Sequence, residues 1–324
     1  MPTLLVNAKM HPALAARIAA SVNGRRSQII KVRSNVKFAF WLRVLFVFSV
    51  VVVVVTILYS RHRERAAFEG ARGALFDEWR REVAAITAKE RGFVERIASI
   101  LAAEASRYQG DLVSDELRPS AALAAALARP TLYLRGPTAG LQAANAINRY
   151  AMESGKDALL LCLLEPPAET AEKSMLPKAR LALAGGPPVN DITRNVSRLA
   201  DAVVGLPYLM PAWGERIKHA KDNVALLRCE RELQKAPLEA AKRASRAEVL
   251  IAALDEPNDA GGVTELDGEH AHSVRVVVID LALGKVLLRL RRQVDPNWVT
   301  PNRRSQYARE LDSCKLAMEI RKSL

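Results

Sequence analysis

Residues Phe38–Tyr59 read FAFWLRVLFVFSVVVVVVTILY and form an apolar segment long enough to cross a membrane. As an α-helix the segment would be about 33 Å long, because each residue rises about 1.5 Å. The hydrocarbon core of a bilayer is about 30 Å thick. Sixteen of its residues are Phe, Ile, Leu or Val. The segment therefore predicts a single transmembrane helix.

The ends of this segment carry residues that are typical of a membrane surface. Trp41 and Tyr59 belong to the aromatic residues that are enriched at the membrane–water interface. Arg43 lies in the second turn of the predicted helix, where its long side chain can extend to the headgroups. We predict that Arg43, Trp41 and Tyr59 are membrane anchors.

Two other interpretations of the segment are disfavoured. A β-strand built from the run Val50–Val55 would be buried in a soluble core, and an apolar stretch of this length is unusual there. A cleaved signal peptide would have a shorter preceding region and small residues at its end. Here the basic residues Arg61 and Arg63 follow the span instead.

The net charge of +13 is concentrated near the span. Residues 1–65 contain eleven Lys or Arg and one acidic residue, Glu64, and so carry +10. The rest of the chain has 37 basic and 34 acidic residues, a balance of +3. A nucleic-acid-binding domain is expected to show a basic surface, and this balance predicts no nucleic-acid partner.

The same charges predict the orientation of the span. Residues 1–37 hold seven basic residues and no acidic ones, and short basic segments remain in the cytoplasm. The residues after the span mix positive charges with acidic ones, although Arg61, Arg63 and Arg65 oppose the assignment. We expect a basic cytoplasmic segment (1–37), an inner (plasma) membrane span (38–59), and a periplasmic or extracellular C-terminal part.

Residues 60–112 have the periodicity of a helical stalk. Apolar residues recur there at steps of three or four, as in Phe68, Ala71, Leu75, Trp79, Val83 and Ile86. One interpretation is a coiled coil that dimerises the protein. The other is an amphipathic helix that packs on its own domain. Gly70, Gly73 and Gly92 lower the helix propensity and weaken the coiled-coil interpretation.

Residues 113–324 predict an exported α/β domain, with α+β as the alternative class, in which helices flank a mixed sheet. The predicted strands are Thr131–Arg135, Asp157–Leu164, Ala247–Leu254, Ser273–Leu281 and Lys285–Gln293. The predicted helices are Leu141–Glu153, Asp191–Val204, Pro211–Leu233 and Arg303–Lys322. The last two strands should form a hairpin, with Gly284 supplying the positive φ of its turn.

Three cysteines allow one disulfide in an exported domain. Cys229 and Cys314 both lie on predicted amphipathic helices, so we expect these two to pair. Cys162 lies in an apolar predicted strand and is interpreted as a small buried hydrophobic residue. Three free thiols are the alternative.

Residues Glu265–His272 hold the densest group of metal-ligand side chains in the sequence. His270 and His272 would point the same way on a strand, and Asp267 and Glu269 could complete a metal site. The nearby glycines favour a solvated polar loop instead. These four residues are therefore weak metal candidates.

The segment Arg135–Gly140 joins a predicted strand to a helix, where backbone amides can bind phosphate. It lacks the Gly-Lys-Ser/Thr ending of a P-loop and the GxGxxG pattern. An ordinary helix start with Thr138 near its cap is the favoured interpretation. With no HExxH, GxSxG or CxxC pattern present, the sequence predicts no catalytic residue and no cofactor.

These observations favour an interaction role over catalysis. We expect a single-pass envelope protein whose exported domain binds or scaffolds another envelope protein or component, with a homodimer through the stalk possible. The alternative is a membrane-tethered enzyme, such as a metal-dependent hydrolase built around His270 and His272.

Overall fold

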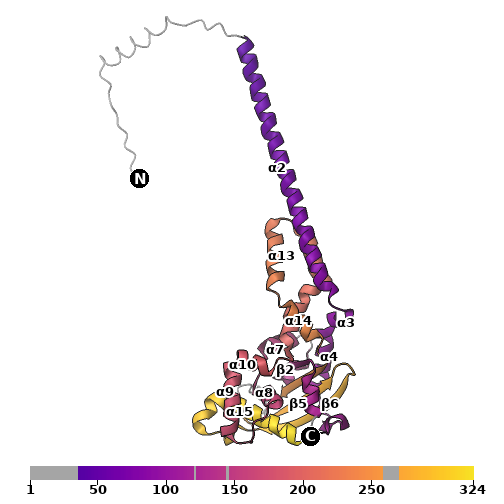
Figure 1. Cartoon of the computed structure of the whole chain (residues 1–324), viewed down its shortest axis with the longest axis vertical. Coiled ribbons are helices and arrows are strands. Elements are labelled where there is room, and N and C mark those ends of the chain that lie inside the picture. The colour runs from indigo at the N-terminus through magenta and orange to yellow at the C-terminus, as the bar shows by residue number, and fades with distance from the viewer. Residues whose placement is uncertain (1–35, 120–121, 144–145, 258–269) are drawn as a thin grey trace, which may run out of the picture. The chain divides into compact units, whose positions relative to one another are not determined.

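The computed structural model describes residues 36–119, 122–143, 146–257 and 270–324 (Figure 1). The chain divides into two compact units, Met1–Ala67 and Phe68–Leu324, and we call the second unit the head. Helix α2 (Val36–Ala84) begins in the first unit and ends in the head.

The apolar part of α2 confirms the predicted membrane-type helix. Within the described residues, one helix is long and apolar enough to cross a membrane. Its large apolar side chains between Phe40 and Tyr59 are 42–71% exposed, so no protein core covers them. The hydroxyls of Ser49 and Thr56 donate to carbonyls one turn earlier, at 2.9 and 2.8 Å, and so need no water. The helix therefore suits a single membrane span.

The head contains a six-stranded mixed sheet, as predicted. Its strand order is β1-β6-β5-β4-β2-β3. β2 is parallel to both β3 and β4, and the other pairs are antiparallel. The strands are β1 (Leu112–Val113), β2 (Thr131–Pro137), β3 (Val196–Arg198), β4 (Val249–Asp255), β5 (His272–Asp280) and β6 (Lys285–Val294). The predicted hairpin joins β5 to β6, and Gly284 has φ +65° in its turn.

Helices make up most of the head. They are α3 (Ala88–Arg91), α4 (Phe93–Ala105), α5 (Ala122–Ala128), α6 (Thr138–Leu141), α7 (Ile147–Glu153), α8 (Ala158–Leu164), α9 (Glu172–Ala184), α10 (Pro187–Ile192), α11 (Leu199–Gly205), α12 (Pro211–Lys218), α13 (Asn223–Lys235), α14 (Leu238–Ser245) and α15 (Pro301–Lys322). Short 3-10 turns occur at η1 (Asp115–Leu117), η3 (Leu206–Leu209) and η4 (Pro296–Trp298).

Two hydrophobic layers enclose the sheet, because successive side chains of a strand point to opposite faces. All seven residues of β4 are buried. Val249, Ile251 and Ala253 pack with α8, α9 and α15 on one face. The intervening residues, such as Leu250 and Ala252, pack with α4, α7, α11 and α14 on the other. This double burial explains why β4 is almost entirely apolar in sequence.

The predicted strand Asp157–Leu164 is wrong, because this segment forms helix α8. Asp157 is the N-cap of α8 and accepts a hydrogen bond from the Leu160 amide at 3.3 Å. The residues that follow are Leu, Ala and Cys, which lack the branched Cβ that favours strands. When a short apolar segment is buried on every side, its sequence has no periodicity by which a helix can be distinguished from a strand.

Three predicted helices are interrupted in the structure. The segment 141–153 is divided between α6 and α7, and 211–233 between α12 and α13, where Asp222 caps the second helix. The segment 191–204 contains the edge strand β3 before α11. The predicted helix at the C-terminal side, 303–322, is confirmed as α15.

The predicted stalk, residues 60–112, contributes to the core of the head. Phe93, Ile97 and Leu101 of α4 are fully buried over the sheet. Farther towards the N-terminus, Leu75 and Trp79 of α2 pack in a third cluster with α12 and α13. Leu75 and Trp79 of the stripe that a coiled coil would use are thus covered by the head itself, whereas Ala71 of the same stripe is exposed.

Candidate functional site

A buried ionic cluster lies at the carboxyl ends of the neighbouring parallel strands β2 and β4. The Arg135 guanidinium donates two hydrogen bonds to the Asp255 carboxylate, at 3.0 Å from Nε and 2.9 Å from Nη2. Their side chains are 4% and 0% exposed. Two parallel bonds of this kind fix the relative orientation of both groups. The carboxyl ends of parallel strands are also where open α/β folds usually bind ligands.

Asp157 is the second carboxylate of the cluster. It accepts hydrogen bonds from Arg135 Nη1 at 3.2 Å and from the Tyr133 hydroxyl at 2.7 Å. Burial and the adjacent charge of Asp157 raise the pKa of Tyr133 well above its usual value, so the phenol remains a donor. From α15, the Ser313 hydroxyl accepts a bond from Arg135 Nη1 at 2.6 Å.

His272 is the second cation of the cluster. Its Nε2 lies 3.1 Å from Asp255 Oδ1, and its Nδ1 lies 2.9 Å from the carbonyl oxygen of His270. Both partners accept hydrogen bonds, so both ring nitrogens donate and the ring is an imidazolium. Burial lowers the pKa of His272, but these bonds outweigh it and the pKa lies above its usual value. Likewise, burial opposes the ionisation of Asp255, but Arg135 and His272 hold its pKa at about 2.

Two carboxyl groups of α15 border the cluster. Glu310 accepts a hydrogen bond from the Ala158 amide at 2.8 Å. Asp312 accepts one from the Trp298 indole, while its Oδ2 has no partner among the described residues. Burial raises the pKa of Asp312 to about 6 and, together with the charge of Asp157, raises that of Glu310. Both groups thus hold a proton more tightly than a carboxyl in water.

The charges of the cluster are buried and paired with one another. Two cations, Arg135 and His272, balance two carboxylates, Asp157 and Asp255, and the four are bonded mainly to one another. The cavities described below are lined by other residues. The arrangement joins β2, β4, β5, α8 and α15, and so serves the stability of the head.

A disulfide fixes the two helices that border this cluster. Cys162 of α8 is bonded to Cys314 of α15, next to Ser313. The expected Cys229–Cys314 pair is therefore wrong. Cys229 is a buried free thiol of α13 that packs with Trp79 and Trp213 in another cluster. Cys162 was missed because an apolar strand, not a helix against α15, was predicted around it.

The predicted metal residues are only partly described. Asp267 and Glu269 lie outside the described residues. His272 opens β5, and both of its ring nitrogens are occupied by the bonds to Asp255 and to the His270 carbonyl. No group of three potential metal ligands occurs among the residues that the structure describes.

The predicted phosphate-type segment serves the fold instead. Arg135 is part of the ionic cluster, and its backbone amide donates to the Ser154 hydroxyl at 2.8 Å. Thr138 opens α6, a helix of only four residues, and is buried. A helix does start here, as the sequence favoured, but its N-cap is Pro137 and no side chain caps it.

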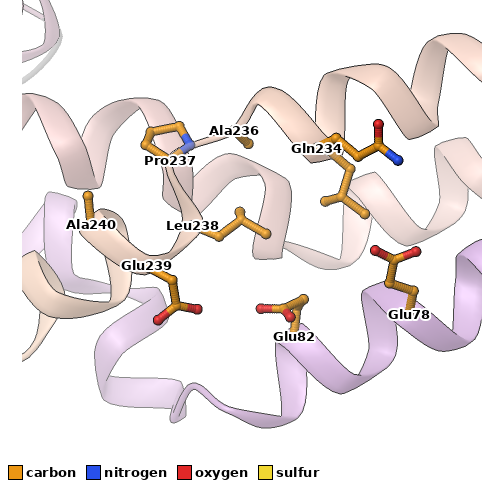
Figure 2. A pocket seen from close by; sticks show the side chains of 9 residues that line it. Glu78, Glu82, Gln234, Ala236, Pro237, Leu238, Glu239 and Ala240 are labelled. Atoms are coloured by element: carbon orange, nitrogen blue, oxygen red, sulfur yellow. The ribbon is translucent and has the colours of Figure 1, made fainter.

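An open groove lies between the head portion of α2 and α13. One cavity of about 590 Å³ is lined by Ala71, Ala74, Leu75, Glu78, Arg81, Asn223, Leu226, Leu227 and Glu230. A second, of about 340 Å³, shares Glu78 and is lined further by Glu82, residues 233–234 and residues 236–240 (Figure 2). Residues 71–82 and 223–240 thus line opposite sides of the groove and run along it in the same direction. We call the two cavities together the α2–α13 groove.

The groove exposes apolar side chains that a solvated helix normally hides. Leu227, which lines the larger cavity, is 48% exposed, and Val224, on the outer face of the same helix, is 68% exposed. Leu226 and Cys229 of α13 are buried. On α2, the small residues Ala71 and Ala74 leave the space that forms the larger cavity. Exposed apolar residues that adjoin a cavity are typical of interaction sites.

The charges of the groove are predominantly acidic. Glu82 and Glu239 both bond Lys242 Nζ at 2.6 Å, which leaves that group satisfied. Glu78 points into the groove in Figure 2. Among the described residues, no ion pair involves Glu78 or Glu230. These two carboxylates are available to a partner.

Tight packing holds the wall of the groove in place. The Trp79 indole of α2 donates to the Tyr208 carbonyl at 2.9 Å. Its ring lies against Gly214 of α12, where an added Cβ would come within 2.4 Å of the ring. Only glycine permits this approach. The groove is therefore a fixed feature of the head.

Comparison of the chain with protein-family models, curated proteins and solved structures finds no match. Functional inference therefore depends on the geometry of the head. The sequence missed the groove because its residues are separated by about 150 positions. The signal available in the sequence was the position of Val224 and Leu227, which lie off the apolar stripe formed by Leu226, Cys229 and Leu233.

Proposed function

We propose that this chain is a single-pass membrane protein whose head lies outside the cytoplasm and binds another protein through the α2–α13 groove. The groove carries this proposal, because it combines a cavity of about 590 Å³ with exposed Val224 and Leu227. Helices commonly bind in apolar grooves between helices.

The location of the head is supported by charge and by the disulfide. The basic segment 1–37 favours an N-terminus in the cytoplasm. The Cys162–Cys314 bond favours an oxidising compartment for the head, since disulfides are rare in reducing ones. In a bacterium the span would then lie in the inner membrane.

A photo-crosslinking residue tests the binding function. Benzoylphenylalanine in place of Leu227 should crosslink the full-length protein in its native membrane to another polypeptide. The matched control carries the same residue in place of Leu283, which is 71% exposed but lies in the β5–β6 turn. Equal crosslinking at both positions, or none at Leu227, would contradict the proposal.

A membrane-tethered hydrolase built around His270 and His272 has less support. Both ring nitrogens of His272 already donate hydrogen bonds, so the ring must lose these bonds to bind a metal. Metal analysis of the purified full-length protein tests this alternative. One tightly bound zinc per chain, lost in His272→Ala, would favour the hydrolase over the binding protein.

A further inference from the structure

We infer that the occupant of the α2–α13 groove is helix α13 of a second copy of this chain. The inference rests on the proposed function, because it names the partner of the same groove. It starts from the outer face of α13, which the head leaves uncovered.

The outer face of α13 is an apolar and basic stripe. Leu226, Cys229 and Leu233 form the buried face of the helix. At 100° per residue, the residues opposite to that face are Val224, Leu227, Arg228, Arg231 and Lys235. All five are exposed, and among the described residues no ion pair involves the three cations. Unpaired cations on an apolar stripe are suited to an acidic apolar groove.

The groove offers the matching surface in the same order along its length. Its first part is lined by Ala71, Ala74 and Leu227, and its next part by Glu78, Arg81 and Glu230, which together carry a net negative charge. The stripe of α13 likewise begins with Val224 and Leu227 and continues with Arg228 and Arg231. α2 and α13 run in the same direction along the groove. A second α13 that lies parallel to them therefore places its apolar residues against those of the groove, and its cations against the carboxylates.

A dimer with two-fold symmetry fills the grooves of both copies at once. In such a dimer each copy inserts its α13 into the groove of the other, so the same contacts form twice. The helix of 13 residues is about 20 Å long, comparable to the roughly 17 Å that residues 71–82 of α2 span along the groove. The interface is small, but two copies held in one membrane meet at a high effective concentration.

Part of the stripe predicted for a coiled coil is already covered. Leu75 and Trp79 are already buried against the head, so they are unavailable to a second chain. The inferred dimer uses the adjoining groove face of α2, which shares Ala71 and Leu75 with this stripe, and the exposed outer face of α13. An antiparallel second α13 would place its cations against Ala71 and Ala74, which leaves Glu78 without a partner.

Cysteine crosslinking in native membranes tests the dimer. Two differently tagged full-length copies are expressed together, one with Ala74→Cys and one with Leu227→Cys, so that only an intermolecular disulfide joins the two tags. Mild oxidation should give a mixed-tag dimer on a non-reducing gel. In the matched control, Leu283→Cys replaces Leu227→Cys and should give about tenfold less dimer.

A charge exchange tests the orientation. Glu78→Arg alone and Arg231→Glu alone should each reduce the crosslink about tenfold, because like charges then meet. The two together should restore it, since the pair is re-formed with reversed signs. Asp77→Arg, an exposed neighbour on α2 outside the groove, should leave the yield unchanged.

The outcomes separate the inference from the proposed function. A photo-crosslink from Leu227 to a different polypeptide, without a mixed-tag dimer, would overturn the dimer and leave the binding function in place. No crosslink to any protein in either experiment would overturn both. A dimer that forms equally well with Glu78→Arg and without its compensating change would overturn the inferred arrangement.

Discussion

Asp255 is the side chain on which the buried ionic cluster depends, because it alone bonds both cations. Replacement by alanine leaves Arg135 and His272 buried without this counter-charge. Breaking a buried pair in this way costs about 3–5 kcal/mol, since the remaining charge is not solvated. We predict that Asp255→Ala lowers the free energy of unfolding by this amount in denaturant titrations of the protein.

A solvent-exposed ion pair provides the control. Arg149 and Glu153 bond at 2.9 Å, but their side chains are 74% and 47% exposed. Glu153→Ala should therefore change the free energy of unfolding by less than about 1 kcal/mol. Equal effects of the two substitutions would show that the cluster is hydrated and not closed.

The raised pKa values predict a head that is most stable in mild acid. Burial raises the pKa of Asp312 to about 6, so its contribution to stability is complete below about 4 and is lost as the pH rises through about 6. The raised pKa of His272 has the same effect: its contribution to stability is complete below about pH 6.5 and is lost as the pH rises further. The lowered pKa of Asp255 acts oppositely, with stability lost as the pH falls from about 4 through about 2.

Melting temperatures measured from pH 3 to pH 8 should therefore be highest between about pH 4 and 6. Asp312→Asn cannot ionise and should flatten the decline between pH 5 and 7. The exposed Asp191→Asn should leave the curve unchanged. A melting temperature that rises steadily to pH 8 would contradict the buried, protonated state of Asp312.

The residues of the ionic cluster show where sequence reasoning ends at this scale. Arg135, Asp157, Asp255 and Ser313 are far apart in the chain, and none lies in a motif. The sequence singled out Arg135 within a phosphate-type segment and His272 for a metal site, and neither for an ionic cluster. A group of charges becomes recognisable from sequence when its members are close in the chain, which was true of residues 265–272 and not of this cluster.

Among the elements, α8 and α15 depend on the bond between Cys162 and Cys314. The two cysteines are 152 residues apart, and a closed loop of that length restricts the unfolded chain. Removing such a bond costs about 4–5 kcal/mol in the chain-entropy description. We predict this loss of unfolding free energy for the double variant Cys162→Ser with Cys314→Ser.

Peptide mapping without reduction checks the pairing itself. The Cys162 and Cys314 peptides should be recovered together, with Cys229 recovered as a free thiol after denaturation. Cys229→Ala should leave that linked pair intact. A linked Cys229–Cys314 peptide would instead support the pairing expected from sequence.

Elements with a clear periodicity were predictable and the others were not. The strands β4, β5 and β6 and helix α15 follow alternation or a helical stripe and were located within a few residues. α8 is apolar on every side because it is covered on every side, so it offers no pattern to interpret. The disulfide partner could not be found while α8 was assigned to the sheet.

At the scale of the whole molecule, the orientation across the membrane is the property to test. A reporter that is active only outside the cytoplasm should be active when fused after residue 65. The same reporter fused after residue 30, within the basic segment, should be inactive. The opposite pattern would place the head in the cytoplasm and remove the basis for an oxidised Cys162–Cys314 bond.

The membrane-type helix and the mixed sheet were the most predictable parts. A membrane-type helix is defined by length and hydropathy, both of which are local, and a mixed sheet by alternation in several short segments. The boundary of the head was less predictable. α4 has the same periodicity whether it extends a stalk or packs on a sheet, and only its tertiary partners distinguish the two.

The long interval between Cys162 and Cys314 also sets an order of events during biogenesis. If the head is exported, as proposed, Cys162 emerges from the translocation channel first, Cys229 second and Cys314 last. Until Cys314 has crossed, Cys229 is the only intramolecular thiol that Cys162 can meet. Premature oxidation would then trap a Cys162–Cys229 species, so maturation of this protein should depend on an enzyme that reshuffles disulfides after export.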